Sequence, residues 1–346
     1  MVKNGRIIGE GYHAKYGDLH AERNAFKNLT ESAEGAEMYV TLEPCCHFGK
    51  QPPCTHAIVE HKIAKVYVGS DDPNEKVAGK GIEYLRENGI EVETRVMKEE
   101  CDRLNDIFFH YITTGTPYVM MKYAMTLDGK IATVTGKSKW ITGEASRVRV
   151  QESRHKYMGI MVGINTVLED DPMLTCRIEG GINPTRIICD SRCRIPLESN
   201  IVKTAREVPT ILAVNGSAEL FEDKTKALEN AGIKILQVDS EDAHIDISKL
   251  MTELGAMGID SVMVEGGGTL NDSILKAGVV NEINVYIAPK IFGGEKARTA
   301  VSGSGVEEVE DAHLFELRSM EQIDDDVLLM YKKRTSQQRH KNNEEI

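Results

Sequence analysis

His20-Ala21-Glu22 opens the stretch that decides the fold, and Pro44-Cys45-Cys46-His47-Phe48-Gly49-Lys50-Gln51-Pro52-Pro53-Cys54 closes it. One imidazole and two thiolates fill three of the four tetrahedral positions around zinc. The fourth position is left for water, as a catalytic rather than a structural zinc site requires. The pattern therefore predicts a catalytic zinc ion bound by His20, Cys45 and Cys54.

The order of these residues is typical of zinc deaminases, in which a His and a nearby non-ligating Glu precede Pro-Cys and a further Cys. Here eight residues separate the two cysteines instead of two. Glu22 is expected to take a proton from zinc-bound water and deliver it to the departing amine. Cys45 is preferred to Cys46 because it directly follows Pro44. A structural zinc site, with Cys46 or His47 as fourth ligand, and a set of thiols without metal are the alternatives.

The composition is that of a soluble globular protein with two domains. A chain of 346 residues exceeds the size at which one core keeps growing. With 41% apolar and 28% charged residues, it has no uncharged apolar run of about 18 residues, so a membrane span is not expected. A net charge of -12 disfavours a nucleic-acid partner. Seven cysteines without an apolar signal core indicate reduced thiols or metal ligands and a cytoplasmic location.

Two α/β modules are expected on either side of Thr114-Gly115-Thr116-Pro117. We expect a deaminase domain over 1–114, a second domain over 117–334 and a disordered polar tail over 335–346. Near the start, Lys3-Asn4-Gly5 predicts a tight hairpin turn. Asp18 is expected to cap a helix that runs through Leu29.

The second module contains no Gly-x-Gly-x-x-Gly after its first strand, so a Rossmann dinucleotide site is not supported. Instead, Val264-Glu265-Gly266-Gly267-Gly268-Thr269-Leu270-Asn271 closes a strand and opens a helix. Free amides at a helix start can hold a phosphate, and glycines let the backbone approach it closely. A plain tight connection explains the same glycines equally well.

The segment from Tyr39 to Cys54, with Asp72-Pro73-Asn74 and Val77-Ala78-Gly79-Lys80-Gly81, resembles a known family. So do the segments at 121–132, 138–142 and 162–177 in the second module. The family is the bifunctional diaminohydroxyphosphoribosylaminopyrimidine deaminase / 5-amino-6-(5-phosphoribosylamino)uracil reductase of riboflavin biosynthesis. The resemblance spans nearly the whole chain. It implies a cytidine-deaminase-like three-layer module followed by a dihydrofolate-reductase-like α/β module, with zinc and NADPH as cofactors.

The resemblance also implies roles for individual residues. In the first module it implies zinc ligands at His20, Cys45 and Cys54, a proton shuttle at Glu22, and substrate contacts from His13, His47, Lys50, Asp72 and Asn74. In the second module it implies NADPH contacts from Ala124, Trp140, Thr166, Asp170, Ser191, Gly266, Gly267, Gly268, Thr269, Leu270 and Asn271. Substrate contacts there would come from Lys122, Ser138, Arg154, Leu174, Arg177 and Glu265.

The residue types fit a hydride transfer from NADPH to C1 of the ribosylamino group, which opens the sugar ring to a ribityl chain. Arg154 and Arg177 are suited to hold a sugar phosphate, although either could instead merely form a surface ion pair. Trp140 could form a wall of the cofactor pocket or belong to a buried core. Glu265 could orient sugar hydroxyls.

One feature departs from the family. Its members usually begin with a helix and a strand that carry an Asn-Pro element before the turn that is Lys3-Asn4-Gly5 here. We expect that strand to lie inside the sheet, so the first module is apparently truncated at its N-terminus. A reductase whose zinc-bound first module is only structural is therefore an alternative. A nucleoside or tRNA deaminase with an unrelated second domain is disfavoured by the acidity of the chain and the spacing of the two cysteines.

In the favoured interpretation the partner is a small-molecule phosphoribosyl-aminopyrimidine, and the chain forms a homo-oligomer.

Overall fold

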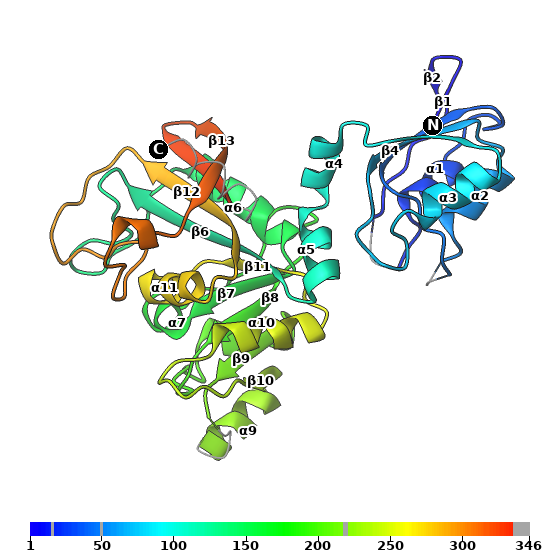
Figure 1. Cartoon of the computed structure of the whole chain (residues 1–346). Coiled ribbons are helices and arrows are strands. Elements are labelled where there is room, and N and C mark those ends of the chain that lie inside the picture. Colours follow the sequence, from blue (N-terminus) through cyan, green and yellow to red (C-terminus); the bar gives the residue numbers. More distant parts are fainter. Residues whose placement is uncertain (15–16, 49–50, 217–220, 335–346) are drawn as a thin grey trace. The chain divides into compact units, whose positions relative to one another are not determined.

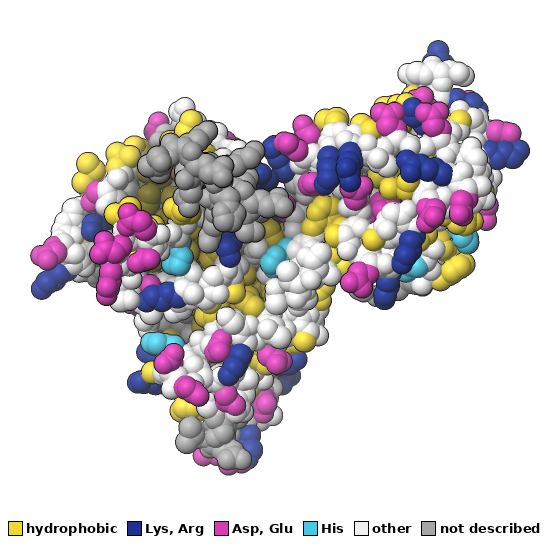
Figure 2. All heavy atoms as spheres, in the orientation of Figure 1, with side chains coloured by type: hydrophobic (Ala, Val, Ile, Leu, Met, Phe, Trp, Pro, Cys, Tyr) yellow, Lys and Arg dark blue, Asp and Glu magenta, His cyan; other side chains and the backbone are white. Residues whose placement is uncertain are grey.

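The computed structural model describes residues 1–14, 17–48, 51–216 and 221–334. The chain divides into two compact units, Met1–Thr114 and Gly115–Ile346, which Figure 1 draws in blue to cyan and in cyan to red. The predicted tail at 335–346 lies outside the described residues. Among the described residues, no helix is both long and apolar enough to span a membrane. On the face drawn in Figure 2, Lys and Arg side chains are interspersed with Asp and Glu.

The first unit is built on a five-stranded sheet of order β2-β1-β3-β4-β5. Its strands are β1 (Val2–Lys3), β2 (Arg6–Ile7), β3 (Glu37–Leu42), β4 (Lys65–Ser70) and β5 (Glu91–Thr94). The last three are parallel, whereas β1 is antiparallel to both of its neighbours. Asn4 and Gly5 both have positive φ between β1 and β2, which confirms the predicted tight turn. Among the described residues, β1 pairs with β3 only through Val2 and Glu37. The expected further strand inside this sheet stays a prediction.

Helices pack on both faces of this sheet. The helices of this unit are α1 (Ala21–Lys27), α2 (Cys54–Glu60), α3 (Lys80–Glu87), α4 (Lys98–Leu104) and α5 (Asp106–Thr114). On one face Val66 and Val68 join a buried core with Ile58 of α2 and Leu85 of α3. On the other face α4 lies against β4 so closely that a Cβ on Gly69 would be 2.3 Å from Cys101 Sγ. The result is the three-layer arrangement expected from the sequence.

The predicted cap of α1 is wrong. The N-cap is His20 rather than Asp18, and it makes no side-chain capping hydrogen bond. The imidazole of His20 instead lies close to the sulfur atoms of Cys45 and Cys54.

The second unit is built on a nine-stranded sheet of order β10-β9-β8-β7-β11-β6-β12-β14-β13. The strands are β6 (Tyr118–Thr126), β7 (Gly159–Gly163), β8 (Thr185–Cys189), β9 (Thr210–Val214), β10 (Ile233–Gln237), β11 (Ser261–Val264), β12 (Val280–Ala288), β13 (Phe315–Ile323) and β14 (Asp326–Lys333). The seven from β10 to β12 in this order are parallel, and β14 and β13 add an antiparallel edge. The carboxyl ends of the parallel strands therefore meet at one edge of the sheet.

Two buried cores cover the two faces of this sheet. The helices of the unit are α6 (Glu144–Lys156), α7 (Ile164–Asp170), α8 (Asn200–Lys203), α9 (Glu222–Asn230), α10 (Ile247–Ala256) and α11 (Gly268–Lys276). Leu250 of α10 and Ile274 of α11 belong to one core. Ile201 of α8 and Leu228 of α9 belong to the other. This arrangement of helices around a mainly parallel sheet agrees with the α/β fold expected for the second module.

Gly255 provides a direct test of the packing of α10. It is buried on α10, and an added Cβ would lie 1.9 Å from the carbonyl oxygen of Gly115. Gly255→Ala should lower the free energy of unfolding of the second unit by about 2 kcal/mol, because backbone cannot yield as a flexible side chain does. Thermal and urea unfolding measure this loss. Ala256→Ser, at the exposed neighbouring position, is the control and should stay within about 0.5 kcal/mol of the parent. Equal stability of both variants would show that the contact is wrong.

Candidate active sites

Three potential metal ligands converge in the first unit. His20 is the N-cap of α1, Cys45 follows β3, and Cys54 is the first residue of α2. His20 Nδ1 lies 3.4 Å from Cys45 Sγ and 3.5 Å from Cys54 Sγ, and all three ligand atoms lie within 4.8 Å of one another. Zinc bonds of about 2.1 Å to nitrogen and 2.3 Å to sulfur would place tetrahedral ligand atoms about 3.6 Å apart. The donor set and its spacing therefore fit one zinc ion.

Glu22 lies on α1 beside this group and is buried. Burial raises the pKa of its carboxyl, and the nearby Cys45 adds to the effect. A carboxyl whose pKa is raised toward neutral can both accept and release a proton. Its place beside the three ligands suits a proton shuttle.

Two charged residues that were not singled out from the sequence support the loops of this site. The buried carboxylate of Glu43 accepts backbone N–H groups from Gly79 (3.0 Å), Gly81 (2.9 Å) and Ile82 (3.3 Å) at the start of α3. Arg23 donates to the carbonyl oxygens of Pro52 and Pro53, both at 2.9 Å. The first interaction fixes the strand end before Cys45, and the second fixes the chain before Cys54. The interaction of Glu43 could have been suspected from the sequence, because a Glu stands directly before Pro44-Cys45 and the Gly79-Lys80-Gly81 segment follows further on.

The structure describes four of the five residues of the first unit that were expected to contact substrate. The ring of His13 lies edge-on to that of His20, with 5.6 Å between ring centroids. Asp72 is buried and accepts the N–H of Asn74 at 2.8 Å. Burial raises the pKa of Asp72, while the hydrogen bond from the Asn74 N–H opposes the shift. The buried Nδ1 of His47 has no hydrogen-bond partner within the described part of the chain, so it can bind a ligand. Lys50 lies outside the described residues.

The second unit contains a cavity of about 880 Å³. Its lining includes residues at or after the carboxyl ends of β6, β7, β8 and β11. Of the residues expected to contact NADPH, it brings together Ala124, Trp140, Thr166, Asp170, Ser191, Gly266, Gly267, Gly268, Thr269 and Leu270. Of the residues expected to contact substrate, it brings together Lys122, Ser138, Arg154, Arg177 and Glu265.

Two of the expected residues do not line this cavity. Asn271 is fully buried, and its Nδ2 donates to the carbonyl oxygen of Ala300 at 2.8 Å. It therefore ties the start of α11 to a neighbouring loop. Leu174 is buried in one of the two cores, although its φ of 50° marks a turn in the loop that leads to Arg177.

The glycine turn after β11 is shaped by close packing. A Cβ on Gly266 would lie 2.7 Å from Asn271 Oδ1, and one on Gly268 would lie 2.9 Å from Thr299 O. These contacts alone require glycine. The turn also borders the cavity just before and at the start of α11, so its amides can face a phosphate there.

A buried ion pair between Arg154 and Glu265 contributes to the polar lining of the cavity. Arg154 donates from Nε to Glu265 Oε1 at 2.7 Å, from Nη2 to Oε2 at 3.1 Å and from Nη1 to Thr175 O at 3.0 Å. Lys122 Nζ lies 3.9 Å from Glu265 Oε2. Burial raises the pKa of Glu265, but Arg154 and Lys122 outweigh it and lower the pKa to about 2. Burial also lowers the pKa of Lys122. Arg154 therefore forms a buried ion pair within the cavity lining, and not the surface ion pair that was the alternative; its contact with the substrate stays a prediction.

The face of α6 toward the cavity was not recognised from the sequence. Arg147, Gln151 and Arg154 all border the cavity, at the spacing of four and three residues that defines one face of a helix. Arg147 lies over the ring of Trp140, 4.6 Å from its centroid. Trp140 is 63% exposed, so it forms part of the cavity wall and not of a buried core.

The fold and the two sites define a two-domain enzyme class, a zinc-dependent deaminase joined to an α/β reductase. Models of two families match the chain accordingly. The cytidine and deoxycytidylate deaminase zinc-binding region matches residues 1–70, and the RibD C-terminal domain matches residues 117–329.

Similar proteins of known family cover nearly the whole chain. The riboflavin biosynthesis protein RibD of Actinobacillus pleuropneumoniae is 50% identical over 96% of this chain and 87% of its own length. That of Bacillus amyloliquefaciens is 40% identical over 95% and 88%. A solved deaminase/reductase from Thermotoga maritima is 35% identical over 96% of this chain and 90% of its own, with a TM-score of 0.85. The chain belongs to the riboflavin biosynthesis protein RibD family.

Membership confirms several of the expectations from the sequence. The chain combines a cytidine-deaminase-like domain with a dihydrofolate-reductase-like domain. It is a bifunctional deaminase and reductase of riboflavin biosynthesis that uses zinc and NADPH. The reductase-only alternative is therefore not supported.

Removing one thiolate tests the zinc site. Cys54→Ser should reduce bound zinc from about one ion per chain to well below half, because a serine hydroxyl is a much harder and weaker ligand. Metal analysis after equilibration with a mild chelator measures occupancy. Cys46→Ser is the matched control and should keep its zinc, since Cys46 is not in the group of converging ligand atoms and its Sγ donates to the carbonyl oxygen of Lys76 at 3.9 Å. Full occupancy in the Cys54 variant, or loss in the Cys46 variant, would contradict the assigned ligands.

Proposed function

We propose that the first domain, residues 1–114, hydrolyses the amine from 2,5-diamino-6-(5-phosphoribosylamino)pyrimidin-4(3H)-one. The second, residues 117–334, then reduces the ribosyl group of the product to ribityl with NADPH. The observation that carries the proposal is the group of three ligand atoms within 4.8 Å beside the buried Glu22. The printed name of the Thermotoga maritima neighbour supports this pair of activities.

In the deaminase step, zinc bound by His20, Cys45 and Cys54 would lower the pKa of a water molecule. Glu22 would take the proton of that water and pass it to the leaving amine, which departs as ammonia. His47, whose buried Nδ1 has no hydrogen-bond partner among the described residues, and the buried carboxyl of Asp72 would bind the substrate. We assign the remaining substrate contacts to His13, Lys50 and Asn74.

In the reductase step, NADPH supplies a hydride to C1 of the sugar, and the ring oxygen that leaves C1 must gain a proton. The amides of the glycine turn at 266–270 would bind the cofactor's phosphates, with further contacts from Ala124, Trp140, Thr166, Asp170 and Ser191. Asn271 does not line the cavity and would support the turn through its hydrogen bond to the carbonyl oxygen of Ala300. Arg154 holds the Glu265 carboxylate in one orientation, so that Glu265 and Lys122 can bind sugar hydroxyls from fixed positions. Ser138 and Arg177 border the same space, whereas Leu174 shapes the loop before Arg177.

We also infer a small-molecule partner for both sites. A cytoplasmic location and a homo-oligomeric state rest on the sequence and the family resemblance, and they stay predictions.

Glu22→Gln separates the two activities. The amide keeps the size of the side chain but removes its basic group, so deamination should fall by about 10²-fold or more while zinc content is unchanged. Ammonia release measures the first activity. Oxidation of NADPH with already deaminated substrate measures the second, which should equal that of the parent. Joint loss of both activities would point to a folding defect, and unimpaired deamination would remove Glu22 from the mechanism.

The reductase should prefer NADPH to NADH. The extra phosphate of NADPH adds negative charge, which amides and cationic side chains around the cavity can bind. We expect kcat/KM to differ by about tenfold or more, the size of one charge-assisted hydrogen bond. Steady-state kinetics with each cofactor decide the matter, and equal values would contradict the preference.

A further inference from the structure

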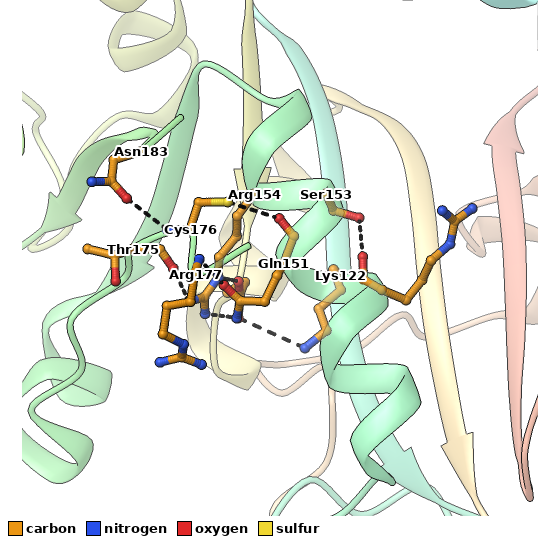
Figure 3. Close-up of polar contacts among 10 residues, drawn as sticks. Lys122, Gln151, Ser153, Arg154, Thr175, Cys176, Arg177 and Asn183 are labelled. Carbon is orange, nitrogen blue, oxygen red and sulfur yellow. Dashed lines mark hydrogen bonds and ion pairs between the residues drawn. The ribbon is translucent and has the colours of Figure 1, made fainter. Parts of the chain in front are cut away.

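Gln151 connects α6 to the loop that carries Arg177. Its side chain is buried, and its Oε1 accepts the backbone N–H of Arg177 at 3.0 Å. Its own carbonyl oxygen accepts from Cys176 Sγ at 3.4 Å (Figure 3). Cys176 N is held in turn by Asn183 Oδ1 at 2.9 Å. The loop beside the cavity is therefore fixed to the helix on both sides of the Cys176–Arg177 peptide.

The bond to Arg177 determines which way the Gln151 amide faces. An amide has one oxygen and one NH₂ group, so committing Oε1 to the Arg177 N–H turns Nε2 to the opposite side. Gln151 borders the cavity, and its Nε2 has no hydrogen bond to any described residue. Nor is Nε2 among the buried polar atoms without a partner. It therefore reaches the cavity as a donor of fixed orientation.

The neighbouring cations differ in what they can offer to a ligand. Arg154 lies three residues further along α6. Its Nε and Nη2 donate hydrogen bonds to Glu265, and its Nη1 donates to Thr175 O. Arg177 is exposed at the cavity wall, and its guanidinium forms no hydrogen bond or ion pair with any described residue. The charge of Arg154 is thus neutralised within the protein, whereas that of Arg177 remains available to an anion.

We propose that Gln151 is a substrate-specificity residue of the reductase, whose Nε2 donates to an oxygen of the substrate's sugar phosphate beside Arg177. This inference rests on the proposed function, which supplies a phosphorylated sugar as substrate. A phosphate dianion needs both a cation and neutral donors of fixed direction, and charged acceptors strengthen such hydrogen bonds. Arg177 and Gln151 provide these two groups in the lining of one cavity, and the bond from the Arg177 backbone to Gln151 joins the two segments that carry them.

Gln151→Glu tests this role with almost no change of shape. The carboxylate keeps an oxygen for the Arg177 N–H but replaces the donor with a negative charge. The KM for the phosphorylated substrate should rise about tenfold or more, and the inhibition constant of ribose 5-phosphate should rise with it. The kcat should fall less than about threefold. The KM for NADPH and the melting temperature should match the parent. Gln151→Met, which removes the donor and also the acceptor of the Arg177 N–H without adding charge, should raise both substrate constants by a smaller factor.

Glu152→Gln is the matched control, since it swaps the same two groups at the exposed neighbouring position of α6. All of its constants should equal those of the parent. Unchanged substrate and ribose 5-phosphate constants in both Gln151 variants would overturn the proposal. A rise in KM for substrate without a rise for ribose 5-phosphate would also overturn it, because Gln151 would then bind the pyrimidine. A raised KM for NADPH would assign Gln151 to the cofactor instead. Failure of the parent enzyme to reduce the substrate would contradict the proposed function and not this inference alone.

Discussion

Parallel strands that end at a common edge are the constraint on which both sites depend. In the first unit, β3 leads into Cys45 and its parallel neighbour β4 leads into Asp72. In the second unit, the adjacent parallel strands β6, β11, β7 and β8 present Ala124, Glu265, Thr166 and Ser191 at or after their carboxyl ends. Residues far apart in the sequence thus meet because hydrogen-bonded strands lie only about 4.8 Å apart. Chemistry at the carboxyl edge of a parallel sheet follows from the topology.

Charged groups buried near these edges are stabilised by partners that also define the sites. Glu43 uses its carboxylate to hold the amides at the start of α3. Glu265 is held in a two-point contact by Arg154. Breaking one partner of such a buried pair typically costs about 3–5 kcal/mol, because the other charge is left without compensation. These carboxylates therefore keep one orientation before substrate arrives. By contrast, the buried Nδ1 of His47 lacks a partner within the described chain and is suited to a ligand.

The sequence was most informative where the chemistry needs a particular residue type at a particular spacing. His20, Cys45 and Cys54 could be proposed because few side chains bind zinc, and the structure brings their ligand atoms together. The turn at Asn4 and Gly5 followed from local backbone preferences. The N-cap of α1 was wrongly assigned to Asp18 because Asp is a favourable capping residue on local grounds alone. In the structure His20 is the N-cap, and its side chain faces the cysteines instead of capping the helix.

What the sequence left open depended on contacts between distant segments. Arg154 and Arg177 look alike in sequence, but the Glu265 that neutralises Arg154 lies 111 residues away. The burial of Asn271 depends on a carbonyl oxygen 29 residues further on. The cavity-facing side of α6 was not recognised from the sequence, although Arg147, Gln151 and Arg154 have the spacing of one helix face. The sequence also gives no sign of which way the amide of Gln151 faces. That direction is set by the backbone of Arg177.

The central claim is that one chain performs a hydrolytic deamination and then a reduction at two separate sites. The most direct test follows ammonia and NADPH together after the diamino substrate is added to the zinc-loaded enzyme. Without NADPH, ammonia should still be released in proportion to the substrate consumed. With NADPH, oxidation should begin after a lag and end at one NADPH per ammonia. Oxidation of NADPH without ammonia, or complete ammonia release with no oxidation, would contradict the account.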